Sequence, residues 1–237
     1  MMLIEALDRN VFQRYTKSEH CTFLERCSGE AMETTRSRRH AKTAQAVLDA
    51  ALEILTEGNI EAISMREIAR RIEYSPSGLY EYFASKDELL EALSMQGFIK
   101  LTEHLNRTIR GGTSSQRLLE SGQAYLDFAR RNPQLYLLMF HRVPPEPAES
   151  RTLAQFLGYL AENSAFAILL AIIRDGVQSG VFKHVPKLGV EKMAYSCWAY
   201  LHGLAMLRLT LLSRKIEDID EANQEMLGAF VASMTVA

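Results

Sequence analysis

The sequence has few cysteines and no long apolar run, and these two shortages exclude several classes of protein. Its three cysteines, Cys21, Cys27 and Cys197, lack the paired spacing of a zinc site, so we expect no structural metal. The apolar stretch of residues 165–173 is shorter than the roughly 18 residues that a membrane span needs. Charged residues interrupt the N-terminal stretch, unlike a secretory signal. We therefore expect a cytoplasmic protein without membrane contact.

Net charge is also nearly absent, at −2 for 237 residues, so any contact with nucleic acid must come from a local basic patch. Such a patch is formed by Arg36, Arg38, Arg39 and Lys42. One interpretation is a solvated charged tail, and the other is a basic arm that contacts the minor groove of DNA. The position of the patch directly before the first expected helix favours the arm.

Catalytic signatures and strand patterns are missing as well. From Thr43 onward, apolar residues recur at helical spacing without strand-like alternation, which predicts an all-α protein. The sequence contains no nucleotide-binding loop, nucleophile elbow or metalloprotease motif. His141 precedes a proline-rich loop at 143–147, which would not hold the geometry of an acid–base site. We expect no enzyme activity, no catalytic residue and no cofactor.

Helix start and stop signals divide the chain into two helical domains. The expected helices cover approximately residues 43–57, 64–71, 75–82, 85–110, 115–131, 133–141, 149–178, 188–212 and 220–234. Gly111-Gly112 is the expected hinge between the domains. We expect an N-terminal extension (1–39), a three-helix DNA-binding domain (40–100) and a helical-bundle domain (113–237).

The N-terminal extension lacks a clean apolar stripe, and Met32 lies just before the basic patch. One hypothesis is that translation begins at Met32 and that residues 1–31 are a disordered or mis-annotated segment. The alternative is a genuine short helix packed on the surface, although termini are often poorly ordered.

Residues 63–82 have the pattern of a helix-turn-helix, in which the second helix enters the major groove of DNA. Ser64, followed by Glu67, predicts a capping box at the first helix. Ser75 and Pro76 suit the start of the second helix. The expected inward-facing residues are Met65, Ile68, Ala69, Ile72, Leu79 and Phe83. The pattern therefore places the N-terminal residues of the second helix against base edges.

Small residues in the second helix, Ser77 and Gly78, would allow its close approach to DNA. Tyr80 and Tyr82 can place hydroxyls on phosphates, and Lys86 can add a full charge. The alternative for both tyrosines is a half-buried position in the core.

The runs S-M-R-E-I-A (64–69) and S-P-S-G-L-Y-E-Y-F-A-S-K-D-E-L-L (75–90) resemble the DNA-binding domain of the TetR family. The resemblance covers residues 40–100, about a quarter of the chain. One departure is Glu73, where the family usually has glycine. A positive φ at Glu73 would cost roughly 1 kcal/mol, which predicts a slightly strained turn. With the basic patch, the resemblance implies DNA contacts by Arg38, Arg39, Lys42, Ser64, Arg66, Pro76, Ser77, Gly78, Tyr80, Tyr82 and Lys86.

A second run, W-A-Y-L-H-G at 198–203, is similar to the W-x-x-x-H-G element of one subgroup of TetR C-terminal domains. The resemblance implies a homodimer through the last two helices, bound to a palindromic double-stranded DNA operator. It also implies a ligand-responsive repressor with an apolar small-molecule effector. The candidate ligand-binding residues are Phe128, Tyr136, Met139, Phe140, Phe166, Leu170, Trp198, His202 and Met206.

Each of these ligand candidates has an alternative role in the core, and Trp198 and His202 also fit a stacked core pair on one helix face. The alternative for the whole protein is a helical ligand-binding or interaction protein that does not bind DNA.

Overall fold

A computed structural model describes residues 35–141, 152–183, 185, 187–212 and 216–236. Within these ranges the regular structure is helical, apart from one isolated antiparallel bridge between Phe182 and Thr235. This confirms the all-α fold. The expectations for Met32, the N-terminal segment and the proline-rich loop concern residues outside these ranges. No helix within them is long and apolar enough to cross a membrane.

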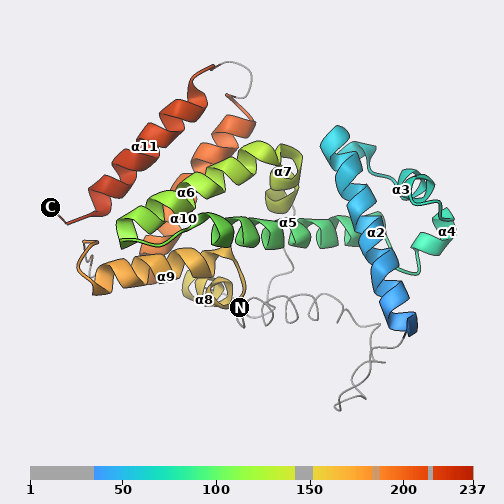
Figure 1. Ribbon diagram of the computed structural model, residues 1–237, viewed down its shortest axis with the longest axis horizontal. Helices are drawn as coiled ribbons and strands as arrows, with labels where there is room; N and C mark the ends of the chain where they lie inside the picture. The colour runs from blue at the N-terminus through green and yellow to red at the C-terminus, as the bar shows by residue number, and fades with distance from the viewer. Residues whose placement is uncertain (1–34, 142–151, 184, 186, 213–215, 237) are drawn as a thin grey trace, which may run out of the picture. The chain divides into compact units, whose positions relative to one another are not determined.

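The chain forms two compact units that divide between Gln96 and Gly97. The first contains a short helical core with the helix-turn-helix. Its elements are α2 (Thr35–Glu57), the 3-10 helix η1 (Ile60–Ala62), α3 (Met65–Arg71), α4 (Pro76–Leu79) and the beginning of α5 (Lys86–Thr108) (Figure 1). Apolar side chains from these α-helices are buried, among them Val47, Ala51, Leu55, Ile68, Leu79 and Leu89.

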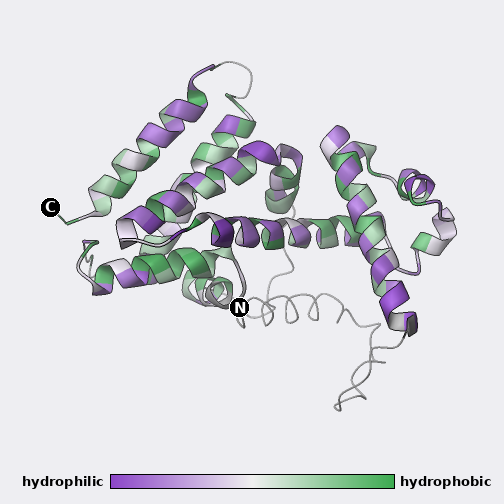
Figure 2. Ribbon diagram, in the orientation of Figure 1, coloured by the Kyte–Doolittle hydropathy of each residue, from purple (hydrophilic) through white to green (hydrophobic). Residues whose placement is uncertain are grey.

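Helix α2 begins at Thr35, whereas the sequence predicted a start near Thr43. The hydroxyl of Thr43 donates to the carbonyl oxygen of Arg39 at 3.1 Å, which is a bond within a helix rather than a cap. Arginine, lysine and alanine are good helix formers and carry α2 through the basic patch. The described part of that patch therefore forms a hydrophilic helical end rather than an extended arm (Figure 2).

The second unit is a helical bundle in which α6 packs against four other helices, α7, α9, α10 and α11. Besides the remainder of α5, its elements are α6 (Ser114–Arg131), α7 (Pro133–His141), α8 (Leu153–Asn163), α9 (Ala165–Gln178), α10 (Gly189–Leu209) and α11 (Ile219–Met234) (Figure 1). A capping box starts α6, because Thr113 and Gln116 bond each other's backbone N–H groups.

One helix break in this unit was not predicted from the sequence. The single helix expected at 149–178 is interrupted at Ser164, whose extended backbone (φ −149°, ψ 175°) separates α8 from α9. The Ser164 hydroxyl accepts a hydrogen bond from the N–H of Phe166 and so caps α9. Gly111 and Gly112 do separate α5 from α6, with φ angles of 105° and 98°. The compact units, however, divide earlier, within α5.

Candidate DNA-binding site and regulatory cluster

The helix-turn-helix is built from α3 and α4, each started by a serine cap. Ser64 accepts a hydrogen bond from the N–H of Glu67 at 3.2 Å, and Ser75 accepts one from the N–H of Gly78 at 3.1 Å. Most of the predicted inward-facing residues are buried, and Ile72 is half-buried. The α-helical part of α4 ends at Leu79 rather than near Tyr82. Turn hydrogen bonds then continue to Phe83, whose N–H donates to the carbonyl oxygen of Leu79 at 3.1 Å.

The turn between the two helices contains the departure from the family pattern. Glu73 has a φ of 53°, and no other non-glycine residue in the described ranges has a positive φ. Its side chain is exposed, so no buried side-chain contact offsets the cost of the strained backbone. The chain therefore makes the same left-handed turn that glycine usually makes, as the sequence predicted.

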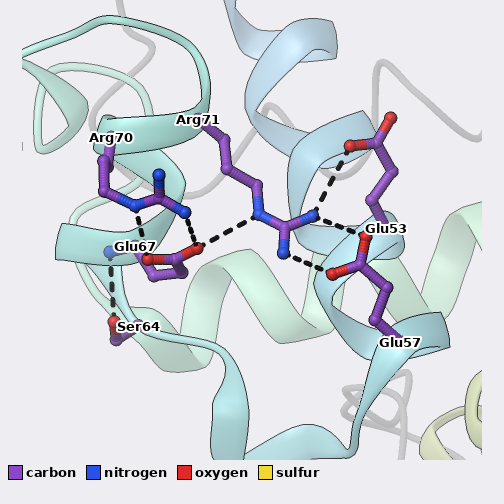
Figure 3. A network of polar contacts seen from close by, with 6 residues as sticks. All are labelled: Glu53, Glu57, Ser64, Glu67, Arg70 and Arg71. Atoms are coloured by element: carbon purple, nitrogen blue, oxygen red, sulfur yellow. Dashed lines mark hydrogen bonds and ion pairs between the residues drawn. The ribbon is translucent and has the colours of Figure 1, made fainter.

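Charged side chains join α3 to α2 near this turn (Figure 3). Arg71 reaches across to α2, where its Nη1 lies 3.1 Å from Glu57 Oε1 and 3.7 Å from Glu53 Oε2. Arg70 Nη2 lies 2.6 Å from Glu67 Oε1, and Arg71 Nε lies 3.2 Å from the same oxygen. Hydrogen bonds from the two arginines lower the pKa of Glu67 to about 2.

This network changes the expected role of Glu67. The sequence predicted a reciprocal capping box with Ser64, but only the serine half forms, because the carboxylate is bonded to Arg70 and Arg71 instead. Glu67 therefore fixes the C-terminal half of α3 and, through Arg71, the orientation of α3 on α2.

Most of the expected DNA contacts lie at the surface of the first unit. Tyr80 is 54% exposed. Ser64 uses an oxygen lone pair as a cap, which leaves its O–H proton available to donate to an acceptor such as a phosphate. The exposed candidates are Arg38, Arg39, Lys42, Ser64, Arg66, Pro76, Ser77 and Tyr80.

Three candidates are more constrained than the sequence indicated, and the first is Gly78. A Cβ atom at this position would lie 2.8 Å from Cε1 of Tyr74 and 3.0 Å from the Ser75 hydroxyl. A side chain at Gly78 therefore meets a neighbouring ring of the same unit before it meets any partner. Ser77, which is exposed one position earlier, is the cleaner probe of clearance on this helix.

Tyr82 is the second constrained residue. Its ring lies 4.5 Å from that of His40 on α2, and its hydroxyl lies 3.3 Å from the hydroxyl of Tyr74. The hydrogen bond to Tyr82 raises the pKa of Tyr74. Tyr74 was not among the sequence candidates, although it lies in the turn and is 41% exposed. Its position directly before Ser75, the cap of the second helix, was the available signal.

Lys86 is the third. Its Nζ donates to the carbonyl oxygen of Ile60 in η1 at 3.3 Å, so the side chain is half-buried and tethers two segments. An ammonium group has three donors, and the remaining ones can still reach a phosphate. Just before α5, the Glu88 carboxylate accepts a hydrogen bond from the N–H of Ala84 at 2.6 Å.

In the second unit, four of the ligand candidates form an aromatic cluster from α7 and α10. The ring of His202 lies 4.4 Å from that of Phe140, 5.8 Å from Tyr136 and 6.3 Å from Trp198. We call these four residues, together with Tyr125 of α6, the regulatory cluster. Trp198, His202 and Phe140 are half-buried, and Tyr136 is fully buried.

The polar atoms of this cluster form one hydrogen-bond chain. Trp198 Nε1 donates to the Tyr125 hydroxyl at 3.2 Å. The hydroxyls of Tyr125 and Tyr136 are 2.8 Å apart, and the Tyr136 hydroxyl lies 2.8 Å from His202 Nδ1. Burial raises the pKa of Tyr125 to about 12, raises that of Tyr136 further, and lowers that of His202.

Sequence reasoning missed Tyr125, which joins Trp198 to Tyr136. The signal was its position on the buried face of α6, two helical turns after the buried Leu118. Phe128, chosen instead from the same helix, is buried beside His104, with ring centres 6.1 Å apart.

The remaining ligand candidates lie around the cluster or in the core. Phe166 of α9 contacts Trp198, with ring centres 6.2 Å apart. Met139 is fully buried where α7 approaches α5, and Leu170 is buried on α9. Met206 is half-buried on α10, one turn after His202.

A separate cavity of about 350 Å³ opens between α6, α10 and α11. Its lining includes the Arg208–Asp220 ion pair, at 2.7 Å, and the buried Asn223. None of the nine sequence candidates lines it. Charged residues line this cavity, whereas the polar groups of the regulatory cluster carry no formal charge when His202 is neutral.

Comparisons with known proteins agree with both units. Residues 47–93 match the family described as "Bacterial regulatory proteins, tetR family", and residues 118–230 match "Tetracyclin repressor-like, C-terminal domain". The uncharacterized HTH-type transcriptional regulator YobS of Bacillus subtilis is 25% identical over 130 residues, covering 54% of this chain and 68% of YobS. The repressor KstR of Mycolicibacterium smegmatis is 37% identical over 87 residues, covering 36% of this chain and 40% of KstR. The alignment therefore spans less than half of KstR.

The fold is also similar to that of solved regulators. The crystal structure of the transcriptional regulator FadR from Bacillus subtilis, in complex with stearoyl-CoA, superimposes with a TM-score of 0.57 at 18% identity. The superposition covers 78% of this chain and 97% of FadR. With a helix-turn-helix matched in the first unit and a repressor-like domain matched in the second, the chain belongs to the TetR family of helix-turn-helix transcriptional regulators.

Proposed function

We propose that this protein is a homodimeric repressor that binds a palindromic operator in the cytoplasm and is released from it by a small molecule. The observation that carries the DNA-binding part is the exposed, small-residue start of α4, capped by Ser75 and flanked by Tyr80 and Arg66. A recognition helix needs such a surface to approach base edges. The name of KstR, a transcriptional repressor, supports repression as the output.

The outward faces of α10 and α11 support a dimer through these helices. A Cβ atom at Gly203 or at Gly228 would have no neighbour within 4 Å, so both positions face open space. Leu207 is 47% exposed and Met226 is 41% exposed. Between the helices, Tyr200 and Phe230 stack with ring centres 4.3 Å apart. Gly203 and Leu207 are four residues apart and share one face of α10, where a small residue next to an exposed apolar one allows two helix pairs to approach closely and bury apolar area.

In such a dimer, two recognition helices read half-sites about 34–36 Å apart or at a longer spacing along the DNA. A ligand that prefers a different separation lowers DNA affinity by its differential affinity for the two states. The complex of FadR with stearoyl-CoA supports a small-molecule effector. The apolar rings of the regulatory cluster favour an effector that is mostly apolar.

The test is a gel-shift titration with DNA from the protein's own upstream region, alongside sedimentation of the free protein. We expect a dimer that binds this DNA much more tightly than it binds unrelated DNA. Leu207→Glu should give monomers that lose operator binding, because two half-sites are no longer joined. Leu153→Glu is the matched control, since Leu153 is 44% exposed on α8, away from the proposed interface.

A folded dimer with no preference for any genomic DNA would favour the alternative, a helical ligand-binding protein without DNA binding. Dimers that persist in Leu207→Glu would contradict the proposed interface.

A further inference from the structure

The hydrogen-bond chain of the regulatory cluster contains two buried phenol groups, and both of their protons need acceptors. Tyr136 is fully buried and Tyr125 is 6% exposed. The Trp198 N–H is a donor only, so it takes a lone pair of Tyr125 and accepts nothing. A buried O–H without an acceptor is costly. The protons of the two phenols and the indole therefore restrict the possible donor and acceptor directions in this hydrogen-bond chain.

Two phenols cannot both donate to each other across one 2.8 Å contact. One proton can lie between Tyr125 and Tyr136, and the other must go elsewhere. The acceptor within reach is Nδ1 of His202, 2.8 Å from the Tyr136 oxygen and 3.5 Å from the Tyr125 oxygen. Either direction of the phenol–phenol bond therefore requires an unprotonated Nδ1.

A proton on Nδ1 would leave one buried phenol without an acceptor among the described residues. This applies to the other neutral tautomer and also to the imidazolium ion, in which both nitrogens are donors. Burial of the ring lowers the pKa of His202 and also favours the neutral form.

We propose that His202 is held as the neutral tautomer with its proton on Nε2, and that this N–H anchors an uncharged apolar effector through a carbonyl oxygen. Nε2 makes no hydrogen bond with any residue in the described ranges, and the ring is half-buried. Phe140 and Trp198 lie beside the ring and supply apolar surface. The ligand part rests on the proposed function, whereas the tautomer part does not.

The class of ligand follows from the surroundings of this donor. An N–H group needs an acceptor, which excludes a pure hydrocarbon as the preferred ligand. A carboxylate would bring a charge among aromatic rings, and burying a charge costs more than burying a hydrogen-bonded carbonyl. A carbonyl oxygen can accept from Nε2 and brings no further proton that needs an acceptor.

The first experiment determines the tautomer in the full-length, ligand-free protein. Histidine is labelled with ¹⁵N, and two-bond ¹H–¹⁵N correlations are recorded at neutral pH. The signals that disappear in His202→Asn identify His202. We expect an unprotonated Nδ1 and a protonated Nε2 throughout, and in Tyr125→Phe/Tyr136→Phe a mixture of both tautomers. A protonated Nδ1 in the wild type would overturn the proposal, and so would a double variant with an unchanged tautomer.

The second experiment uses Trp198, the single tryptophan of the chain, as a fluorescent reporter within the cluster. The probes are 2-alkanones of increasing chain length and alkanoates of matched length. We expect a 2-alkanone to alter the Trp198 emission and to bind at least about tenfold more tightly than the matched alkanoate. The ratio reflects the greater cost of burying the carboxylate charge, because both probes can accept a hydrogen bond from Nε2.

Two amide variants distinguish the roles of the two ring nitrogens of His202. The Asn amide approximates the position of Nδ1 and can accept from Tyr136, but it offers no donor at the outer position. The Gln amide offers that donor. We expect His202→Asn to lose about tenfold in 2-alkanone affinity and His202→Gln to lose less. Equal affinity in the wild type and His202→Asn, tighter binding of alkanoates, or no response to any 2-alkanone would overturn the ligand part.

These experiments distinguish a failure of the proposal for His202 from a failure of the proposed DNA-binding function. A protein that binds no DNA would contradict operator binding while the nitrogen signals and the fluorescence titration still decide the state of His202 and its ligand.

Discussion

In the first unit, the polar groups that orient the helices are charged and lie at the surface, with Glu67, Arg70 and Arg71 in one network. The second unit also has ion pairs between helices, such as Arg208–Asp220, but its regulatory cluster is uncharged and largely buried, with Tyr125 and Tyr136 joined to His202. Water and salt ions can replace the partners of an exposed ion pair, so these pairs orient α3 but contribute little to the free energy of unfolding. Buried hydrogen bonds have no such alternative, so the regulatory cluster has few arrangements that satisfy every proton.

This difference fits the tasks proposed for the two units. A surface that meets DNA in salt-dependent equilibrium keeps its charges solvated and available. A site proposed to respond to one ligand benefits from a donor whose position and protonation are fixed in advance.

Ser77→Leu should abolish operator binding while leaving the fold intact. The larger side chain would hold α4 away from the groove, and we expect at least a hundredfold loss, about 3 kcal/mol or more. Gel-shift titration gives the affinity, and thermal melting checks the fold. Ser77→Ala, which keeps the clearance, should lose less than about tenfold. Native affinity in folded Ser77→Leu would mean that another face of α4 meets DNA.

Tyr136→Phe should destabilise the second unit by about 1–3 kcal/mol, because it removes a buried hydroxyl and leaves its partners less well paired. Denaturant unfolding followed by Trp198 fluorescence measures the effect. Arg70→Ala is the contrasting variant, and we expect it to cost less stability because its ion pair is exposed. If Arg70→Ala proved the more damaging change, the contrast between the two units would be wrong.

Lys86→Ala should weaken binding to all DNA sequences alike and reduce the slope of log affinity against log salt by about 1 per subunit. The structure adds a second effect, since the hydrogen bond to the Ile60 carbonyl is also lost. Lys86→Arg keeps the charge and should keep the slope. A selective loss for one operator variant would instead indicate a base contact.

The pH dependence of stability should differ between the units. The pKa of His202 is lowered in the folded state, so between its folded and ordinary values the unfolded chain binds more protons. Its contribution is therefore present above the ordinary histidine pKa of about 6.5 and is lost as the pH falls below it. His202→Asn should flatten this part of the profile, measured by melting temperature against pH.

Glu67 contributes in a separate and lower window. Its pKa is lowered to about 2 by Arg70 and Arg71, so its contribution is present above the ordinary glutamate pKa and is lost as the pH falls toward 2. Glu67→Gln should change the profile only in that acid range. A change near neutral pH in Glu67→Gln would contradict this separation.

The helix-turn-helix was predictable because its signals are local. Ser64 and Ser75 act on backbone groups within a few residues, and the left-handed turn at Glu73 was expected from the resemblance to a family that usually has glycine there. The apolar residues of α3 and α4 face inward as their spacing requires. The start of α2 was misplaced because Thr43 suits both a cap and a helix interior, and sequence alone does not decide between them.

Long-range contacts were not predictable. No local signal sends the Lys86 ammonium to the carbonyl oxygen of Ile60 or the Arg71 guanidinium to Glu57 of α2. Each depends on where a second element lies after packing. For the same reason the cavity between α6, α10 and α11 and the hub role of Tyr125 were missed.

By itself, then, the sequence determined the all-α fold and the helix-turn-helix, because helical periodicity, caps and turns act over a few residues, and it indicated four of the five residues of the regulatory cluster. Tertiary structure alone decided that Trp198, Tyr125, Tyr136 and His202, from three helices, form one hydrogen-bond chain. The physical reason is that a buried proton must find its acceptor in space, and residues far apart in the sequence supply it here.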